Sequence, residues 1–332
     1  MLSRDADACY WIGRYVERAE ATARMIDVHY HSALETPIDP VAEEIPILWN
    51  SILSISGSEE EFHEKYGEPT DRNVLYYFAF DKENPDSIFQ MWSMARENAR
   101  SIREQLSSEM WEALNISWLA LREWNMDRLL AGIPHTFFQQ VKDSSHLFQG
   151  ILNRTMMMGE TRDWLDTGRF LERGGQTARL LDVKYHDLLP AYRSQENPLL
   201  LGGEEWGVGS IVDMHSWIAV LKSVSAFEMY RKTYREGIHP NHIIDFLVLH
   251  PQFPASVRHC LARVEGCLRR ISGNKTNDML ILPERLLGRL NADLNYTRPE
   301  EIIQIGLHEF LERVLEQCDS IGDAITAQYL SY

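Results

Sequence analysis

Residues 13–31 read GRYVERAEATARMIDVHYH, and they recur at 168–186 as GRFLERGGQTARLLDVKYH. The two copies share the Gly-Arg start, a Glu-Arg pair, a Thr-Ala-Arg run, an Asp-Val pair and a Tyr-His end. Two unrelated segments of this length would share about one residue at ordinary amino-acid frequencies. The chain is therefore a tandem duplication.

Both copies lie in segments with helical signals. Ser3 can cap a helix with Asp5 and Asp7 in its first turn, and no breaker follows until Pro37, so this helix is expected to end near Leu34. The second copy begins after Gly159 and is expected to stop before Pro190. Each helix would have about eight turns, which is typical of a helical bundle.

Weaker similarity extends the duplication along the chain. Trp49, Leu53, Tyr66 and Asn73 recur in register as Trp217, Leu221, Tyr234 and Asn241, and His135, Phe137 and Val141 resemble His308, Phe310 and Val314. We predict an all-α bundle of two pseudo-twofold-related multi-helix repeats, 1–156 and 157–332, packed as one globular unit. Further helices are expected near 41–55, 87–106, 108–128, 134–156, 211–235, 240–249, 254–272, 278–293 and 299–330.

Few segments depart from helical patterning. The stretch VLYYFAF at 74–80 has strand propensity and matches IIDFLVL at 243–249, but neither is a period-2 run bounded by turn residues. We interpret both as short buried helices. Loops are predicted at 36–45, 57–72 and 190–210, where Pro, Gly and polar residues gather.

Composition excludes several classes of partner. The chain of 332 residues has a net charge of −16, so free nucleic acid and anionic membranes would be repelled. Its four cysteines lack CxxC spacing, and the sequence shows neither an export signal nor a membrane-spanning run. We expect a cytoplasmic protein with reduced thiols.

A polar arc is repeated on both long helices. On a helical wheel, Arg14, Glu17, Arg24, Asp27 and His31 lie on one side of the first helix, opposite an ordinary apolar stripe. A solvated face gives no reason to keep the same charged residues in both copies. The arc is therefore expected to meet a defined counterpart. Its candidate binding or interface residues, with the adjacent motif arginines, are Arg14, Glu17, Arg18, Arg24, Arg169, Glu172, Arg173, Gly175 and Arg179.

Three interpretations of the arc stay open. The two arcs can face each other and pair to fix the packing of the halves. Alternatively, the arginines can bind a carboxylate or phosphate. In the third interpretation the oriented pairs Asp27/His31 and Asp182/His186, four residues apart, act as acid–base units. We expect no metal site, since a second Glu-x-x-His helix is missing, and no nucleotide-binding loop or other cofactor signal appears.

One difference between the copies predicts an opening. Ala19-Glu20 of the first helix corresponds to Gly174-Gly175 of the second, and each glycine costs roughly 1 kcal/mol within a helix. We hypothesise an open notch at Gly175, for a ligand or a crossing helix.

An arginine stripe lies in ARENARSIREQL at 95–106, where Arg96 and Arg100 share one helical face. Its counterpart has Arg263 opposite Arg96. The stripe can bind an anion or form ion pairs on a solvated surface.

These motifs together resemble the alpha-E family, a bacterial all-helical domain that has no settled activity and is named for a repeated Glu-Arg motif. The resemblance rests on LSRDADACYWIGRYVERAEATARMIDV, on ARENAR leading to MWEALN, and on TRDWLDTGRFLERGGQTARLLDV. By motif position, the signature falls on Glu17, Arg18, Glu172 and Arg173, and its middle part on Arg96, Glu97, Asn98 and Arg100. Gly174 departs from the alanine that usually follows the second Glu-Arg.

The resemblance implies association with a circularly permuted ATP-grasp protein and with transglutaminase-like peptidases. We therefore expect an accessory or substrate-binding component in small-peptide synthesis or processing, with no cofactor of its own, that presents an anionic peptide or amino acid to its partner. The alternatives are an enzyme acting through the Asp and His residues of the repeated helix, and a purely structural scaffold.

Overall fold

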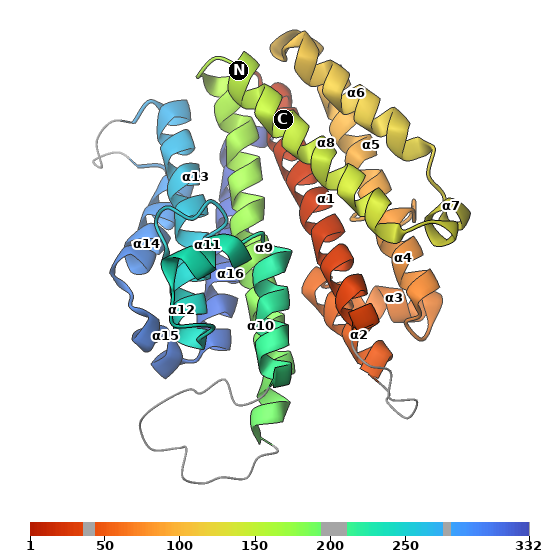
Figure 1. Cartoon of the computed structure of the whole chain (residues 1–332). Helices are drawn as coiled ribbons and strands as arrows, with labels where there is room; N and C mark the ends of the chain where they lie inside the picture. Colours follow the sequence, from red (N-terminus) through yellow and green to blue (C-terminus); the bar gives the residue numbers. More distant parts are fainter. Residues whose placement is uncertain (36–43, 194–210, 275–279, 332) are drawn as a thin grey trace.

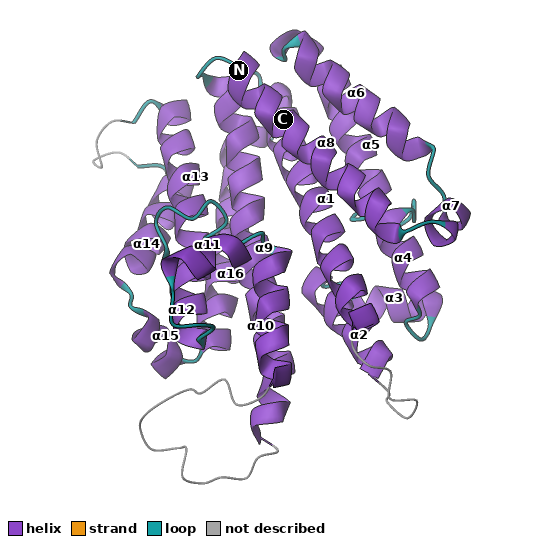
Figure 2. Ribbon diagram, in the orientation of Figure 1, coloured by secondary structure: helices purple, strands orange, loops and turns teal. Residues whose placement is uncertain are grey.

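The computed structural model describes residues 1–35, 44–193, 211–274 and 280–331, with side chains described for 1–31, 49–183, 217–274 and 280–331. Throughout these residues the chain is helical, and no strand occurs among them (Figure 2). The helices are α1 Ser3–Glu35, α2 Glu44–Ser56, α3 Glu59–Tyr66, α4 Asp71–Ala79, α5 Ile88–Ser101, α6 Ser108–Arg122, α7 Met126–Ala131, α8 Pro134–Thr155, α9 Glu160–Arg193, α10 Ile211–Ser223, α11 Phe227–Thr233, α12 Pro240–Ile244, α13 Val257–Ser272, α14 Leu282–Tyr296, α15 Pro299–Ile305 and α16 Leu307–Ile325.

The described helices form two four-helix bundles, and each bundle contributes one helix to the central pair, α1 and α9. In the first, α1 contacts α5 and α8, and α6 contacts both of these. In the second, α9 contacts α13 and α16, and α14 contacts both of these. Figure 1 shows α1 and α9 side by side at the centre of the molecule. The pseudo-twofold relation and the boundary between residues 156 and 157 stay predictions from the sequence.

The predicted all-α class is confirmed, and most of the expected helices are present. All of VLYYFAF except its last residue, Phe80, lies in α4, where Val74, Leu75, Tyr77 and Phe78 are buried, as expected for a short buried helix. The loops predicted at 36–45 and 190–210 lie largely outside the described residues.

Several boundaries were predicted wrongly. The segments expected as single helices at 108–128, 211–235 and 299–330 are each divided, into α6 and α7, α10 and α11, and α15 and α16. The expected loop at 57–72 contains α3, which has three glutamates in its first turn, where they favour the helix dipole, and buries Phe62. Helix α9 continues through Pro190 to Arg193. A proline in the last turn removes only one hydrogen bond, so it does not stop the helix at once.

Glycines set the distance between α1 and α9. A Cβ atom on Gly13 would overlap the carbonyl oxygen of Leu165 and lie 2.9 Å from the backbone nitrogen of Arg169. A Cβ atom on Gly168 would overlap the carbonyl oxygen of Tyr10. The two backbones are therefore in direct contact where the duplicated motif begins, and only glycine fits there.

Alanine at Gly13 or Gly168 should lower the free energy of unfolding by ~3 kcal/mol or more, because the obstructing atoms are backbone atoms that cannot move aside. Gly150→Ala is the matched control: Gly150 is exposed in α8, with nothing within 4 Å of a Cβ position. That change should stabilise by up to ~1 kcal/mol. Urea denaturation measures all three, and equal effects would contradict the close crossing.

Candidate functional site

The Glu-Arg pairs of α1 and α9 exchange partners across the crossing. Arg18 of α1 donates to Glu172 of α9, with Nε–Oε1 at 2.6 Å and Nη2–Oε2 at 3.0 Å. Arg173 of α9 donates to Glu17 of α1, with Nε–Oε1 at 2.5 Å and Nη2–Oε2 at 2.8 Å. Glu17 and Glu172 are buried, 3% and 4% exposed. Each fork-shaped pair satisfies both oxygens of a buried carboxylate, so this reciprocal exchange joins the two bundles.

Further donors complete both carboxylates, but not in the same way. Glu172 also accepts from Arg14 Nε at 2.8 Å and from Gln176 Nε2 at 2.9 Å. Glu17 instead accepts from Gln149 of α8 at 3.2 Å. Burial alone would raise the pKa of Glu172, but the charges of Arg18 and Arg14 outweigh it and hold that pKa far below its usual value. Glu172 is therefore an anion held by two arginines.

Arg169, the counterpart of Arg14, does not join the exchange. It pairs with Asp166 of its own helix at 2.7 Å, and its guanidinium lies over the ring of Phe170. Burial lowers the pKa of Arg169. Arg14 of the first copy therefore contacts Glu172 of the second, whereas Arg169 of the second copy makes no equivalent contact with Glu17.

The aspartates of the arc hold the neighbouring helices of each bundle. Asp27, 5% exposed, accepts from Lys142 Nζ at 2.7 Å and from His135 Nδ1 at 2.8 Å, both of α8. Asp182 pairs with His308 Nδ1 of α16 at 2.8 Å. The partners His135, Lys142 and His308 were not predicted from the sequence, although the similarity of His135 to His308 was a usable signal.

The predicted acid–base pair Asp27/His31 does not have the expected geometry. His31 Nδ1 lies 2.8 Å from the backbone oxygen of Asp27 and 3.5 Å from its carboxylate. The main partners of Asp27 come from α8 instead. The Asp182/His186 pair cannot be compared, because the His186 side chain lies outside the described residues.

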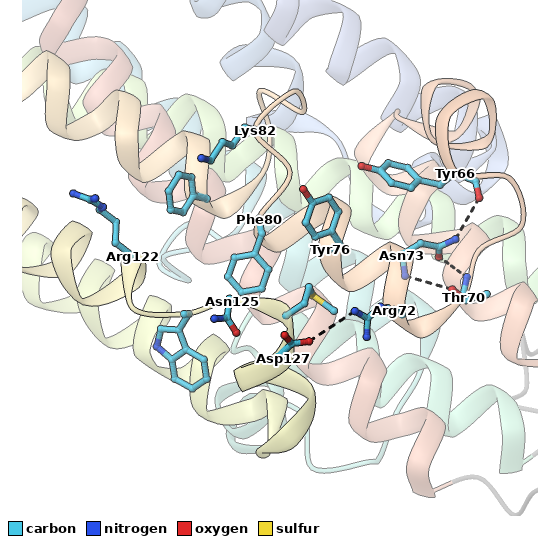
Figure 3. A pocket seen from close by; sticks show the side chains of 13 residues that line it. Tyr66, Thr70, Arg72, Asn73, Tyr76, Phe80, Lys82, Arg122, Asn125 and Asp127 are labelled. Carbon is cyan, nitrogen blue, oxygen red and sulfur yellow. Dashed lines mark hydrogen bonds and ion pairs between the residues drawn. The ribbon is translucent and has the colours of Figure 1, made fainter.

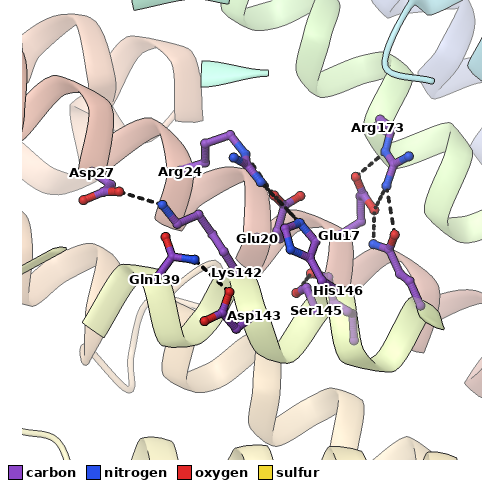
Figure 4. A network of polar contacts seen from close by, with 12 residues as sticks. Glu17, Glu20, Arg24, Asp27, Gln139, Lys142, Asp143, Ser145, His146 and Arg173 are labelled. Atoms are coloured by element: carbon purple, nitrogen blue, oxygen red, sulfur yellow. Dashed lines mark hydrogen bonds and ion pairs between the residues drawn. The ribbon is translucent and has the colours of Figure 1, made fainter. Parts of the chain in front are cut away.

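In the first copy, polar side chains fill the space between α1 and α8. Arg24 pairs closely with Glu20, and His146 lies 3.5 Å from Arg24. Figure 4 shows these side chains in a row with Asp27–Lys142 and Glu17–Arg173. Arg24 is therefore committed to an internal contact.

In the second copy the corresponding space is open. The register that aligns His135 with His308 places Leu315, Asp319 and Gly322 opposite Lys142, His146 and Gln149, and Gly175 replaces Glu20. A cavity of about 250 Å³ results. It is lined by Trp11, Arg14, Leu171, Glu172, Gly175, Gln176, Arg179, Leu315, Cys318, Asp319, Gly322, Asp323 and Thr326.

The two adjacent glycines of α9 have separate roles. A Cβ atom on Gly174 would lie 3.2 Å from the Cβ of Cys260 in α13, whereas nothing lies within 4 Å of a Cβ position on Gly175. Gly174 thus permits close packing of α13, and Gly175 faces open space. The structure places a cavity where the notch was hypothesised.

Arg179 differs from every other arginine of the arc. It is half-buried at the cavity and makes no hydrogen bond or ion pair within the described part of the chain. Its counterpart Arg24 is neutralised by Glu20, whereas position 175 supplies no carboxylate. A guanidinium without a partner is a donor for an external anion.

The arginine stripe of α5 forms surface pairs. Arg96 donates to Asn115 at 2.8 Å and to Glu97 at 2.6 Å, and Arg100 contacts Glu97 at 2.7 Å. Arg263 and Arg270 of α13 reach Asp166 and Asp163 of α9, at 4.0 and 2.6 Å. The stripe is therefore engaged within the protein.

A larger open groove, of about 820 Å³, lies at α4, α6 and α7 (Figure 3). Tyr76, Phe80 and Trp124 line it, together with Lys82 and Arg122. No residue of the duplicated motif reaches it, so we place the candidate site at the smaller cavity.

The cysteines do not contribute nucleophiles. Cys9, Cys260, Cys267 and Cys318 are free and buried, and burial raises the pKa of each thiol to about 12. They remain protonated at neutral pH and act as packing residues.

Residues 1–330 match a family profile described as a predicted alpha-helical domain with a conserved ER motif. The chain belongs to the Alpha-E family. Its two Glu-Arg pairs are the ones that exchange partners between α1 and α9. In this Alpha-E chain the motif is therefore a reciprocal ion-pair lock between two helices.

The Alpha-E chain is also similar to uncharacterised proteins of Mycobacterium bovis and of two strains of Mycobacterium tuberculosis. Each is 22% identical over 97% of this chain, which spans only 36% of the relative's length. No solved structure matches the chain. Within its described residues, no helix is both long and apolar enough to cross a membrane.

Glu172→Gln should lower the free energy of unfolding by ~3–5 kcal/mol, because it leaves the half-buried Arg14 without a carboxylate among the described residues and leaves Arg18 with only the partly exposed Asp86, at 2.5 Å. Glu17→Gln should cost less, because Glu17 holds one arginine. Glu97→Gln, which affects only the exposed pairs of α5, is the control and should cost less than ~1 kcal/mol. Chemical denaturation compares the three, and equal costs would contradict the lock.

The Asp182–His308 pair should make stability depend on pH. Asp182 raises the pKa of His308, and Glu312 and Glu309 add to this. The pair therefore makes its full contribution to the free energy of unfolding below the ordinary histidine pKa of about 6.5. This contribution is lost as pH rises through the raised pKa of His308. The stability difference between wild type and His308→Gln should shrink as pH rises above the ordinary histidine pKa of about 6.5. A difference that grows over this range would contradict the assignment.

Proposed function

We propose that this protein is a substrate-binding accessory component, which takes a small amino acid or peptide into the cavity at Gly175. The observation that carries the proposal is Arg179, the one arginine of the arc with no internal partner among the described residues. The other arginines of the arc are held by carboxylates of the protein. The guanidinium of Arg179 is therefore available to bind an anionic group of a ligand.

The lining of the cavity favours a zwitterion. Arg179 offers a planar fork to a carboxylate, and the exposed Asp319 and Asp323 offer anionic oxygens to an ammonium group. Trp11, Leu171 and Leu315 supply apolar walls for a side chain. A cavity of about 250 Å³ has room for one amino acid or a small dipeptide.

The partner in this proposal is an ATP-grasp peptide ligase, with a transglutaminase-like protein as a second component. Support comes from the family resemblance and from the relatives, which extend far beyond the region matched by this chain. ATP would bind to the ligase, and this chain would present the acceptor or donor amino acid. Co-purification from the native host, followed by mass spectrometry, tests the partnership.

A structural scaffold is the second candidate, and the internal exchange of Glu17, Arg18, Glu172 and Arg173 favours it. In that case the cavity would have no ligand. Ligand binding therefore separates the two proposals.

Arg179→Gln should weaken binding of an amino acid by ~10–100-fold, the effect of losing one charged hydrogen-bonding group. Gly175→Leu should also weaken it, by filling the cavity. Isothermal titration with L-glutamate, L-aspartate and their dipeptides measures this effect. Arg24→Gln is the matched control, because Arg24 is the sequence counterpart of Arg179 but lies outside the cavity, and it should bind as wild type does. No binding by wild type, or equal binding by Arg179→Gln, would favour the scaffold.

A further inference from the structure

We propose that Asp27, His31 and His135 form a binding site for a divalent transition-metal ion such as Zn²⁺. The site lies between α1 and the first turn of α8, and none of its three residues lines the cavity at Gly175. One ligand atom from each residue can be chosen so that all three lie within 4.8 Å of one another. The carboxylate and one histidine come from α1, and the second histidine comes from α8.

The distances suit a small ion. Asp27 Oδ1 lies 2.8 Å from His135 Nδ1 and 3.5 Å from His31 Nδ1. Ligand atoms about 2 Å from a tetrahedral Zn²⁺ are separated by roughly 3.3 Å. Both carboxylate–imidazole distances are therefore already close to this value. The two histidine nitrogens, within 4.8 Å of each other, can approach an ion once His31 Nδ1 gives up its contact with the Asp27 carbonyl.

The chemistry of the three groups also suits this class of ion. Two imidazoles and one carboxylate are preferred ligands of Zn²⁺ and related first-row ions. The side chains of His31 and His135 are 45% and 44% exposed, whereas that of Asp27 is 7% exposed. An ion can reach the site from solvent, and its remaining coordination position would face water.

Lys142 supports the carboxylate from behind. Its Nζ lies 2.7 Å from Asp27 Oδ2, which leaves Oδ1 directed toward the two histidines. Outer-shell hydrogen bonds of this kind orient a metal ligand. Because the ammonium also repels a cation, we expect moderate affinity.

The duplication gives independent support. All three residues recur in the second copy, as Asp182, His186 and His308, and Asp182 again contacts the α16 histidine at 2.8 Å. His135 and Lys142 already hold α8 against α1 through Asp27. Helix packing therefore gives no reason for the half-exposed histidine at position 31. A shared ligand set explains all three.

The test is titration of the metal-free full chain with Zn²⁺ by calorimetry, and with Co²⁺ by visible absorption. His31→Gln and His135→Gln should each weaken Zn²⁺ binding by at least ~10-fold. His146→Gln is the matched control: it is an exposed histidine of the same helix α8, outside the set, and it should bind as wild type does. Each variant is also made with His308→Gln, so that an ion at the second copy does not mask the loss.

Circular dichroism checks that the variants remain folded. His31→Gln keeps the test valid even if His135→Gln unfolds, since His31 makes no contact with α8 other than its ring edge against His135 among the interactions described for it. Absence of Zn²⁺ uptake by wild type, or equal binding by wild type and His31→Gln, would overturn the proposal.

Discussion

The structure depends on two buried carboxylates that each hold the arginine of the opposite helix. This exchange requires the backbones of α1 and α9 to touch, which Gly13 and Gly168 allow. With a side chain at either glycine, the helices would separate and the forks of Arg18 and Arg173 would lose their alignment with Glu172 and Glu17. The close contact at the glycines and the Glu-Arg ion pairs thus depend on each other. The buried charges are tolerated because every carboxylate oxygen of Glu17 and Glu172 accepts a hydrogen bond.

The flanks of this lock have diverged between the two copies. In the first copy, Glu20 neutralises Arg24 and the polar side chains of α8 fill the gap beside it. In the second, Gly175 and Gly322 leave a cavity and Arg179 without a counter-charge. The two copies therefore retain the same central lock, while the described residues beside it form a filled polar contact in the first copy and an open cavity in the second.

Much of this could be predicted from the sequence. The long helices, the absence of strands among the described residues and the open space at Gly175 follow from periodicity and from comparing the copies. The pairing of Arg18 with Glu172 could not be predicted, because it depends on the crossing point of two helices far apart in the sequence. His135 and Lys142 were missed for the same reason, and α3 was missed because its glutamates resemble a polar loop until Phe62 is seen to be buried.

The direct backbone contact at Gly13 and Gly168 also limits how the molecule can move. Two bundles joined through side chains alone could slide or hinge, because side chains can change rotamer. Here the contact is between main-chain atoms, which have no alternative rotamers, and the adjacent charges would lose their partners on any separation. We therefore expect the two bundles to move together as one rigid body.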